Sequence, residues 1–234
     1  MRNCFIYNNR PSLDFGIYIS GSGTFNAPER DVSKTEIPGR NGDLLIDNKR
    51  FRNVELTYPA FIRHNFKSLT DEARMWLMKS AGYARLEDTY HPDQYRMARF
   101  SGPLDFDMRF LNRSGECSLT FDCKPQRFLI IGDHPIGIER EIKLYNPTPF
   151  DALPLIRVYG TGGNLMVGDL IVRIDSIDGY IDIDSDTQNA YKGSTNCNGD
   201  IYAPSFPVLK AGKTGIKGEG NITKIVIKPR WWTI

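Results

Sequence analysis

The sequence has few of the features that mark a membrane protein, a secreted protein or a nucleic-acid binder. No apolar run approaches the ~20 residues needed to cross a bilayer. The first residues lack a charged-then-apolar signal pattern, so we expect no secretion. Lysines and arginines are scattered, and the formal net charge is only +2. This balance argues against nucleic acid or a membrane as the main partner.

Cysteine is scarce as well. The four cysteines form no CxxC pair, and Cys117 and Cys123 alternate with polar residues along one predicted strand. Two side chains with this separation on one strand lie roughly 20 Å apart, which is too far for a disulfide. We therefore expect buried, reduced thiols and a protein made for a reducing cytoplasm.

Recognisable catalytic motifs are also missing. None of the three histidines, His64, His91 and His134, has the spacing of a metal ligand set. There is no GxSxG nucleophile elbow, and no phosphate-binding fingerprint. We predict that the chain is not an enzyme and that it has no catalytic residue, no metal site and no cofactor.

Two motifs look functional at first sight but have simpler explanations. The run Asp182 to Asp186 opens like a calcium loop, but Thr187 and Gly193 stand where that loop needs Gly and Glu. We expect a half-buried strand, with Ile181 and Ile183 inside, that ends in a turn. The glycine-rich segment 160–163 follows a strand without a helix or a Lys-Ser/Thr pair after it. We interpret it as a hairpin turn.

Most of the chain shows the short alternating apolar runs of β-strands, separated by turn residues. The first series comprises Phe15–Ile19, Asp43–Asp47, Val54–Tyr58, Tyr95–Phe100, Leu104–Phe110 and Ser118–Cys123. The second comprises Ile138–Tyr145, Pro154–Gly160, Asn164–Val167, Asp169–Ile174, Tyr180–Asp184, Phe206–Leu209, Gly215–Gly218 and Ile222–Ile227. The even spacing of the second series predicts a β-sandwich. Proline and glycine residues in segment 124–137 indicate a domain boundary there.

One helix is predicted between Ser68 and Gly82. Ser68 or Thr70 can cap its amino end, and Gly82 can close its carboxyl end. The apolar residues of this segment fall on one helical face, which predicts that the helix packs against a sheet. They are Leu69, Ala73, Trp76, Leu77 and Ala81.

The segment from Gly16 to Pro59 is the most informative part of the chain. Its middle is too polar and charged for a core, but it contains too many alternating aliphatics for a plain linker. We interpret residues 32–52 as an arm, a hairpin that leaves its own domain to lie on another surface. An ordered hairpin of this kind points to assembly. The candidate interface residues are Pro38, Gly39, Arg40, Asn41, Arg50 and Arg52.

Three phrases in this sequence resemble the distal tail proteins of long-tailed, non-contractile bacteriophages (siphophages). The first is Ile37-Pro38-Gly39-Arg40-Asn41-Gly42-Asp43-Leu44, preceded by Pro28 to Asp31. The second covers Asn146 to Gly160, and the third covers Gly179 to Tyr191. Together they span most of the chain in the expected order.

The resemblance implies a mainly β fold in two domains. Residues 1–134 would form a β-barrel-like, ring-forming domain with one helix and the arm. Residues 135–234 would form a galectin-like β-sandwich that projects outward. The histidine and tryptophan of a galectin sugar site have no counterparts at the required places in this half, because it has no histidine and its tryptophans are Trp231 and Trp232. We expect that aromatic pair to cover the edge of the last sheet.

The resemblance also implies a function. The protein would be a structural hub at the tail tip or baseplate of the virion, closing into a homo-hexameric ring with an open channel. The ring would join the tail tube to the tail-tip or tail-associated lysin protein, and receptor-binding proteins could attach to it. It would be made and assembled in the cytoplasm of the bacterial host. The alternatives are a carbohydrate-binding module that recognises host surface glycans and, third, a hydrolase.

Overall fold

The computed structural model describes residues 3–21, 26–63, 65–109 and 114–234. The chain divides into two compact units: residues 1–127 with Ile234 form unit 1, and Phe128–Thr233 form unit 2. Each unit has its own hydrophobic core. The prediction of a mainly β protein with one α-helix is confirmed for the described residues.

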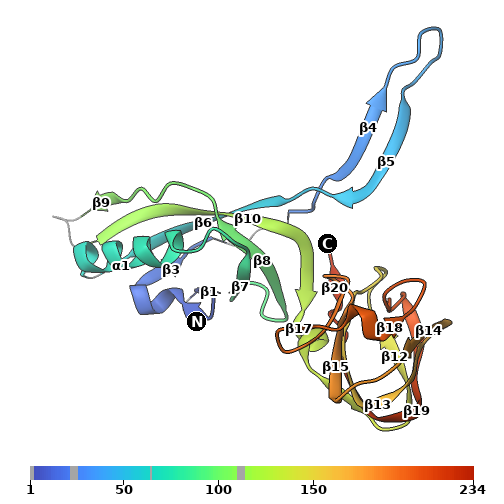
Figure 1. The fold of residues 1–234 in the computed structure, drawn as a ribbon. Coiled ribbons are helices and arrows are strands. Elements are labelled where there is room, and N and C mark those ends of the chain that lie inside the picture. Colours follow the sequence, from blue (N-terminus) through green and yellow to red (C-terminus); the bar gives the residue numbers. More distant parts are fainter. Residues whose placement is uncertain (1–2, 22–25, 64, 110–113) are drawn as a thin grey trace. The chain divides into compact units, whose positions relative to one another are not determined.

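Unit 1 is built on a curled sheet with the strand order β2-β1-β7-β8-β10-β6-β3, in which β9 pairs with β10 (Figure 1). The strands are β1 (Phe5–Tyr7), β2 (Arg10–Pro11), β3 (Ile17–Ile19), β6 (Val54–Ile62), β7 (Ala84–Asp88), β8 (Gln94–Phe100), β9 (Asp107–Arg109) and β10 (Ser114–Leu129). Alternate residues of β6 are buried, as expected for a strand with one face on a core. The predicted strand end at Phe110 lies outside the described residues.

Strand β10 continues through Pro125, where the sequence suggested a break. The division between the units falls between Arg127 and Phe128, inside the predicted boundary segment 124–137, after Pro125 and before Gly132, Pro135 and Gly137. A 3-10 turn, η2 (Ile130–Asp133), follows the strand.

Aromatic side chains fill the space between the sheet of unit 1 and helix α1 (Phe66–Met78). Trp76 on the helix stacks on Phe15 of the 3-10 turn η1 (Ser12–Phe15), with ring centroids 4.2 Å apart. It also stacks on Phe5 of β1 at 5.7 Å. Such pairs contribute about 0.5–1.5 kcal/mol each beyond the burial of their area, so they fix the helix against the sheet.

The predicted apolar face of the helix is largely confirmed. Ala73, Trp76 and Leu77 are buried in the core of unit 1, and Leu69 packs against it. Ala81 is exposed because the helix ends before it. Among the described residues, no helix combines the length and the apolar character that crossing a membrane requires.

The predicted amino-terminal cap is wrong. The helix begins at Phe66, and Asn65 precedes it with a left-handed backbone (φ 51°) and no side-chain cap. The hydroxyls of Ser68 and Thr70 donate instead to the carbonyls of Asn65 and Phe66. Both residues therefore lie inside the first turns, because the apolar Phe66 extends the helix toward its amino end to reach the core.

Unit 2 is built on a second sheet with the order β11-β19-β13-β15-β16-β17, to which β12, β14 and β18 are added. Its strands are β11 (Ile136–Ile138), β12 (Glu141–Asn146), β13 (Leu155–Val167), β14 (Leu170–Ile174), β15 (Gly179–Asp184), β16 (Asn189–Lys192), β17 (Thr195–Asn196), β18 (Ile201–Tyr202) and β19 (Gly212–Lys228). A 3-10 turn, η3 (Asn198–Asp200), precedes β18. The last strand, β20 (Trp232–Thr233), pairs with β10.

The glycines at 160–163 do not form the predicted hairpin turn. They lie inside β13, where the register with β19 shifts on both sides of Gly160. Gly160 and Gly163 have φ values of 144° and 139°, and a Cβ on Gly160 would lie 2.1 Å from the carbonyl oxygen of Asn221. Glycine is needed here because two long strands bend together, so that residues on both sides of the bend line one core.

The terminal tryptophans pack within unit 2. Trp231 is 5% exposed and belongs to the core. Trp232 stacks on Phe150 with ring centroids 4.4 Å apart, and its Nε1 donates to the carbonyl of Asp151 at 2.9 Å. These contacts hold the end of the chain, including β20, against unit 2.

Candidate assembly site

The predicted arm is a two-stranded hairpin. Strand β4 (Arg30–Thr35) pairs with β5 (Leu44–Phe51) in antiparallel register, Thr35 facing Leu44 and Ser33 facing Ile46. Among the described residues these two strands pair only with each other and form a separate sheet (Figure 1). Every residue of β5 except Phe51 is exposed.

The arm carries a run of exposed aliphatic side chains. Leu44, Leu45 and Ile46 are 40%, 61% and 51% exposed, and Ile37 before the turn is 37% exposed. Because side chains alternate along a strand, Leu44 and Ile46 lie on one face of the hairpin and Leu45 on the other. We call these four residues the arm cluster. The arm therefore presents apolar side chains on both of its faces.

The arm cluster is the part of the site that our sequence reasoning missed. We chose polar and turn residues as interface candidates because the segment as a whole is polar. The signal that identifies the cluster is three aliphatics in a row, Leu44 to Ile46, because a strand with one buried face alternates apolar and polar residues.

Four of the predicted interface residues lie in the connecting turn. Pro38, Gly39, Arg40 and Asn41 are all exposed there. The backbone N–H of Arg40 donates to the carbonyl of Ile37 at 3.1 Å, and Gly39 has a φ of 80°. Glycine suits this left-handed position, so the turn holds a defined shape and leaves the side chain of Arg40 in solvent.

The other two predicted residues lie at the base of the arm and meet on one carboxylate. Arg50 Nε donates to Asp31 Oδ2 at 2.7 Å, and Arg52 Nη2 donates to Asp31 Oδ1 at 3.2 Å. These hydrogen bonds hold the pKa of Asp31 below its ordinary value. The structure thus gives Arg50 and Arg52 a role within the arm, where they tie β5 and its end to β4.

The acidic run in unit 2 differs from our expectation. Ile181 and Ile183 are buried as predicted, but Asp182 and Asp184 are also buried, at 4% and 6% exposure. Arg157 binds Asp182 through two hydrogen bonds of 2.7 and 2.8 Å. Both aspartates can be buried because each forms an ion pair with an arginine, Asp182 with one on β13 and Asp184 with one near the end of the chain.

The second of these pairs joins Asp184 to Arg230. The two hydrogen bonds measure 2.6 and 3.1 Å. Burial raises the pKa of Asp184, but the hydrogen bonds and charge of Arg230 and the backbone N–H of Asp186 outweigh burial and lower the pKa overall. This run is an ion-paired structural element in which both carboxylates are already occupied.

The thiols are free, as predicted, but Cys123 is buried whereas Cys117 is only half-buried. Burial raises the pKa of Cys117 and Cys123 to about 12, so both are protonated and weakly nucleophilic at neutral pH. Within the described ranges, no group of three or more His, Cys, Asp and Glu side chains is placed to hold a metal ion.

The whole chain has the fold of phage tail hub and baseplate proteins. No protein-family model matches this chain, and no curated protein matches its sequence. The similarity is to solved structures, at identities near 10% that show the fold alone.

One of these structures is the Dit protein (gp 19.1) of phage SPP1, described as a paradigm of the hub adsorption apparatus in phages that infect Gram-positive bacteria. It has a TM-score of 0.74 and 12% identity, and the match covers 97% of this chain and 98% of that chain. Two structures of the phage P2 baseplate in its activated conformation, with calcium and with strontium, have TM-scores of 0.52 and 0.50. Their identities are 9% and 10%, and each match covers 97% of both chains. The predicted resemblance is confirmed at the level of the fold.

Proposed function

We propose that this protein is a structural hub of a phage tail tip, and that its copies close into a ring through the arm. The fold supports this proposal, because both units match a tail hub protein over almost the full length of both chains. The observation that carries it is the arm cluster, which leaves four large aliphatic side chains exposed on an ordered hairpin.

The arm needs another surface for a physical reason. A hairpin of two strands is marginally stable in water, because it gains little from burying side chains. Full burial of a leucine or isoleucine contributes about 1.5–3 kcal/mol. The half-exposed side chains of the arm cluster would therefore gain about 1 kcal/mol each when covered. Covering them on a neighbouring subunit offsets the entropy lost when the arm becomes ordered.

A ring follows when the arm of each subunit lies on a different surface of the next subunit. Such a contact is heterologous. Repeating it closes a ring when the rotation from one subunit to the next is a whole-number fraction of a full turn. Six subunits, a tail tube on one side and a tail-tip or tail-associated lysin protein on the other are what the distal tail family implies. We extend these partners, receptor-binding proteins and the location at the virion tail tip to this chain as parts of the proposal.

The test is a double substitution, Leu45→Ser with Ile46→Ser, in the full-length protein. The matched control is Ile171→Ser, because Ile171 of β14 is 50% exposed, close to the 51% of Ile46. Light scattering after size-exclusion chromatography measures the mass over a wide concentration range. We expect rings for wild type and control, and monomers with unchanged thermal unfolding for the double variant.

Two results would overturn the proposal. One is a wild-type protein that stays monomeric at high concentration and in the presence of its tail-tip partner. The other is a double variant that closes into rings at the same concentration as wild type. A glycan array with the full-length protein tests the carbohydrate-binding alternative, and specific glycan retention by monomers would favour it.

A further inference from the structure

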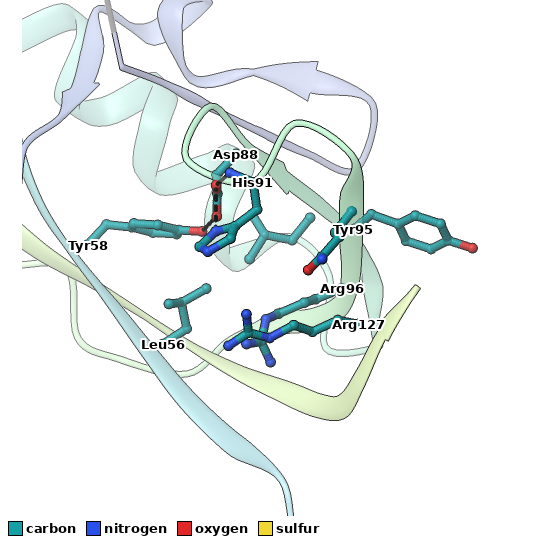
Figure 2. A pocket seen from close by; sticks show the side chains of 9 residues that line it. Leu56, Tyr58, Asp88, His91, Tyr95, Arg96 and Arg127 are labelled. Carbon is teal, nitrogen blue, oxygen red and sulfur yellow. Dashed lines mark hydrogen bonds and ion pairs between the residues drawn. The ribbon is translucent and has the colours of Figure 1, made fainter. Parts of the chain in front are cut away.

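Unit 1 contains a small space bounded by two arginines. It measures about 20 Å³ and is lined mainly by residues of β6, β7 and β8, together with Arg127 near the end of β10 (Figure 2). Figure 2 shows the guanidinium groups of Arg96 and Arg127 side by side, below the pair formed by Tyr58 and Asp88. A space of this size holds one water-sized particle.

Both arginines hold the segment that leads into the arm. Arg96 Nη2 donates to the side-chain oxygen of Asn26 at 3.2 Å, and Arg127 Nη2 donates to its backbone carbonyl at 2.6 Å. The amide nitrogen of Asn26 donates to the backbone carbonyl of Glu55 at 2.8 Å. Asn26 is thus fixed by both arginines and by β6, just before β4 begins.

Each arginine also has a buried donor atom without a partner among the described residues. These atoms are Nη1 of Arg96 and Nε of Arg127. Arg96 is only 8% exposed, so water outside the protein does not satisfy its donor. A buried donor left unpaired costs about 1–3 kcal/mol, and more when it is charged, so two such atoms at one space call for an acceptor.

The charges around the space do not balance. Within the described part of the chain, neither Arg96 nor Arg127 forms an ion pair. Burial and the charge of Arg127 both lower the pKa of Arg96. The lining carboxylate, Asp88, is already occupied: it accepts from the hydroxyl of Tyr58 at 2.6 Å and from the backbone N–H groups of Tyr90 and His91 at 2.9 Å each.

We propose that this space binds a small monatomic anion, of the class of chloride, between the guanidinium groups of Arg96 and Arg127. Both partnerless donors belong to side chains that line the space, so an anion there would accept a hydrogen bond from each. Its negative charge would also offset the repulsion between the two guanidinium groups. Gln94 also lines the space: its Oε1 is a buried acceptor without a partner among the described residues, and turning the amide by half a turn would present its N–H₂ group to the anion. The small size of the space favours a monatomic anion over phosphate or sulfate.

The anion would stabilise the base of the arm. Arg96 and Arg127 bind Asn26 through Nη2, and an anion would accept from one further nitrogen of each, Nη1 of Arg96 and Nε of Arg127. Binding to the folded state alone raises the free energy of unfolding by RT ln(1 + c/Kd), where c is the anion concentration, so stability increases with that concentration. The folded protein should therefore respond to the identity of the anion, and not only to ionic strength.

Crystals of the full chain soaked in sodium bromide test the site directly. We expect an anomalous bromide peak between Arg96 and Arg127, and the absence of that peak, or a water in its place, would overturn the proposal. In solution, thermal unfolding is measured while sodium chloride replaces sodium gluconate at constant ionic strength. We expect the midpoint to rise with chloride in the wild type.

Two variants make the solution test specific. Arg127→Gln removes one donor charge and should abolish the rise with chloride. Arg173→Gln is the matched control, because Arg173 is an exposed arginine of unit 2 that pairs with Asp175, and it should keep the rise. An equal response of both variants would overturn the proposal. If Arg127→Gln fails to fold, the bromide peak in wild type decides the question.

Discussion

Two long antiparallel strand pairs in this molecule use their side chains in opposite ways. In β13–β19, alternate residues such as Ile156, Val158 and Leu165 are fully buried in the core of unit 2. In β4–β5, Leu44, Leu45 and Ile46 are exposed on both faces of the hairpin. The first pair is stabilised by its own unit, whereas the second has apolar surface that no described part of its own unit covers.

The difference shows how to separate a strand that builds a core from a strand that makes a contact. Hydrogen bonds along a ladder are similar in both cases, so they do not distinguish the two pairs. The free energy that fixes a strand pair comes from what packs on its faces. For the arm, we expect that packing to come from another subunit.

The largest effect should come from the bend of the packed pair. We expect Gly160→Ala to lower the free energy of unfolding by at least about 3 kcal/mol, because it combines positive-φ strain with a backbone clash. The new Cβ would lie 2.1 Å from the carbonyl oxygen of Asn221, at a φ of 144°. Chemical denaturation measures this loss.

The matched change in the arm is Gly39→Ala. Its φ is 80°, but nothing lies within 4 Å of the new Cβ. We expect a smaller loss of about 1 kcal/mol, because the left-handed strain remains but the backbone clash is absent. Equal losses for the two glycines would show that the arm is as tightly coupled to its unit as β13–β19.

An intermediate effect is expected at the buried ion pair of unit 2. Asp184→Asn should cost about 2 kcal/mol near neutral pH, because it leaves Arg230 partly unpaired. Since the folded pKa of Asp184 is lowered, the stabilisation is fully present above its ordinary value near 4 and is lost as the pH falls through the folded value. Urea unfolding at pH 7 and pH 3 should therefore show a difference between wild type and variant that shrinks in acid.

Asp178→Asn is the control for this pH dependence. Asp178 pairs with Lys192 at 2.8 Å, but its side chain is fully exposed. We expect no measurable change in stability at either pH, because solvent screens such a pair. A difference for Asp184→Asn that does not change with pH would show that the charge of Asp184 is not what stabilises the pair.

The smallest effect on the folded subunit concerns the arm itself. In the monomer, we expect amide hydrogens of β5 to exchange within about tenfold of unfolded rates, because an unpacked hairpin opens easily. Amides of β13 should exchange only through global unfolding. Mass spectrometry of monomers and rings measures both, and strong protection of β5 in the monomer would contradict the proposed role of the arm.

Much of the fold follows from local pattern. The apolar face of α1 and the strands around Phe121 are legible because helix and strand periodicities place their side chains on one side. The bend at Gly160 could not be predicted from the sequence. Turns and strand bulges both use glycine for its ability to adopt a positive φ, so the residue alone does not tell them apart. Only the pairing with β19 decides between them.

The assembly site shows the same limit. The arm is predictable because it is polar, ordered by proline and glycine, and too aliphatic for a linker. The arginines are harder to assign: Arg50 and Arg52 meet on Asp31 within the arm, and Arg40 stays in solvent. Sequence spacing alone does not distinguish an arginine that stabilises its own hairpin from one that is available to bind another subunit, because both are exposed and charged.

The pairing at the two ends of unit 2 has a consequence for protein engineering. The N–H of Leu129 donates to the carbonyl of Trp231 at 2.8 Å, and the N–H of Arg230 donates to the carbonyl of Gly132 at 2.8 Å. The first and last segments of this unit are therefore neighbours, as in domains that tolerate insertion and exchange. Unit 2 can be treated as a cassette: a different β-domain with adjacent ends could be grafted at Phe128 while unit 1 keeps its own core and its arm.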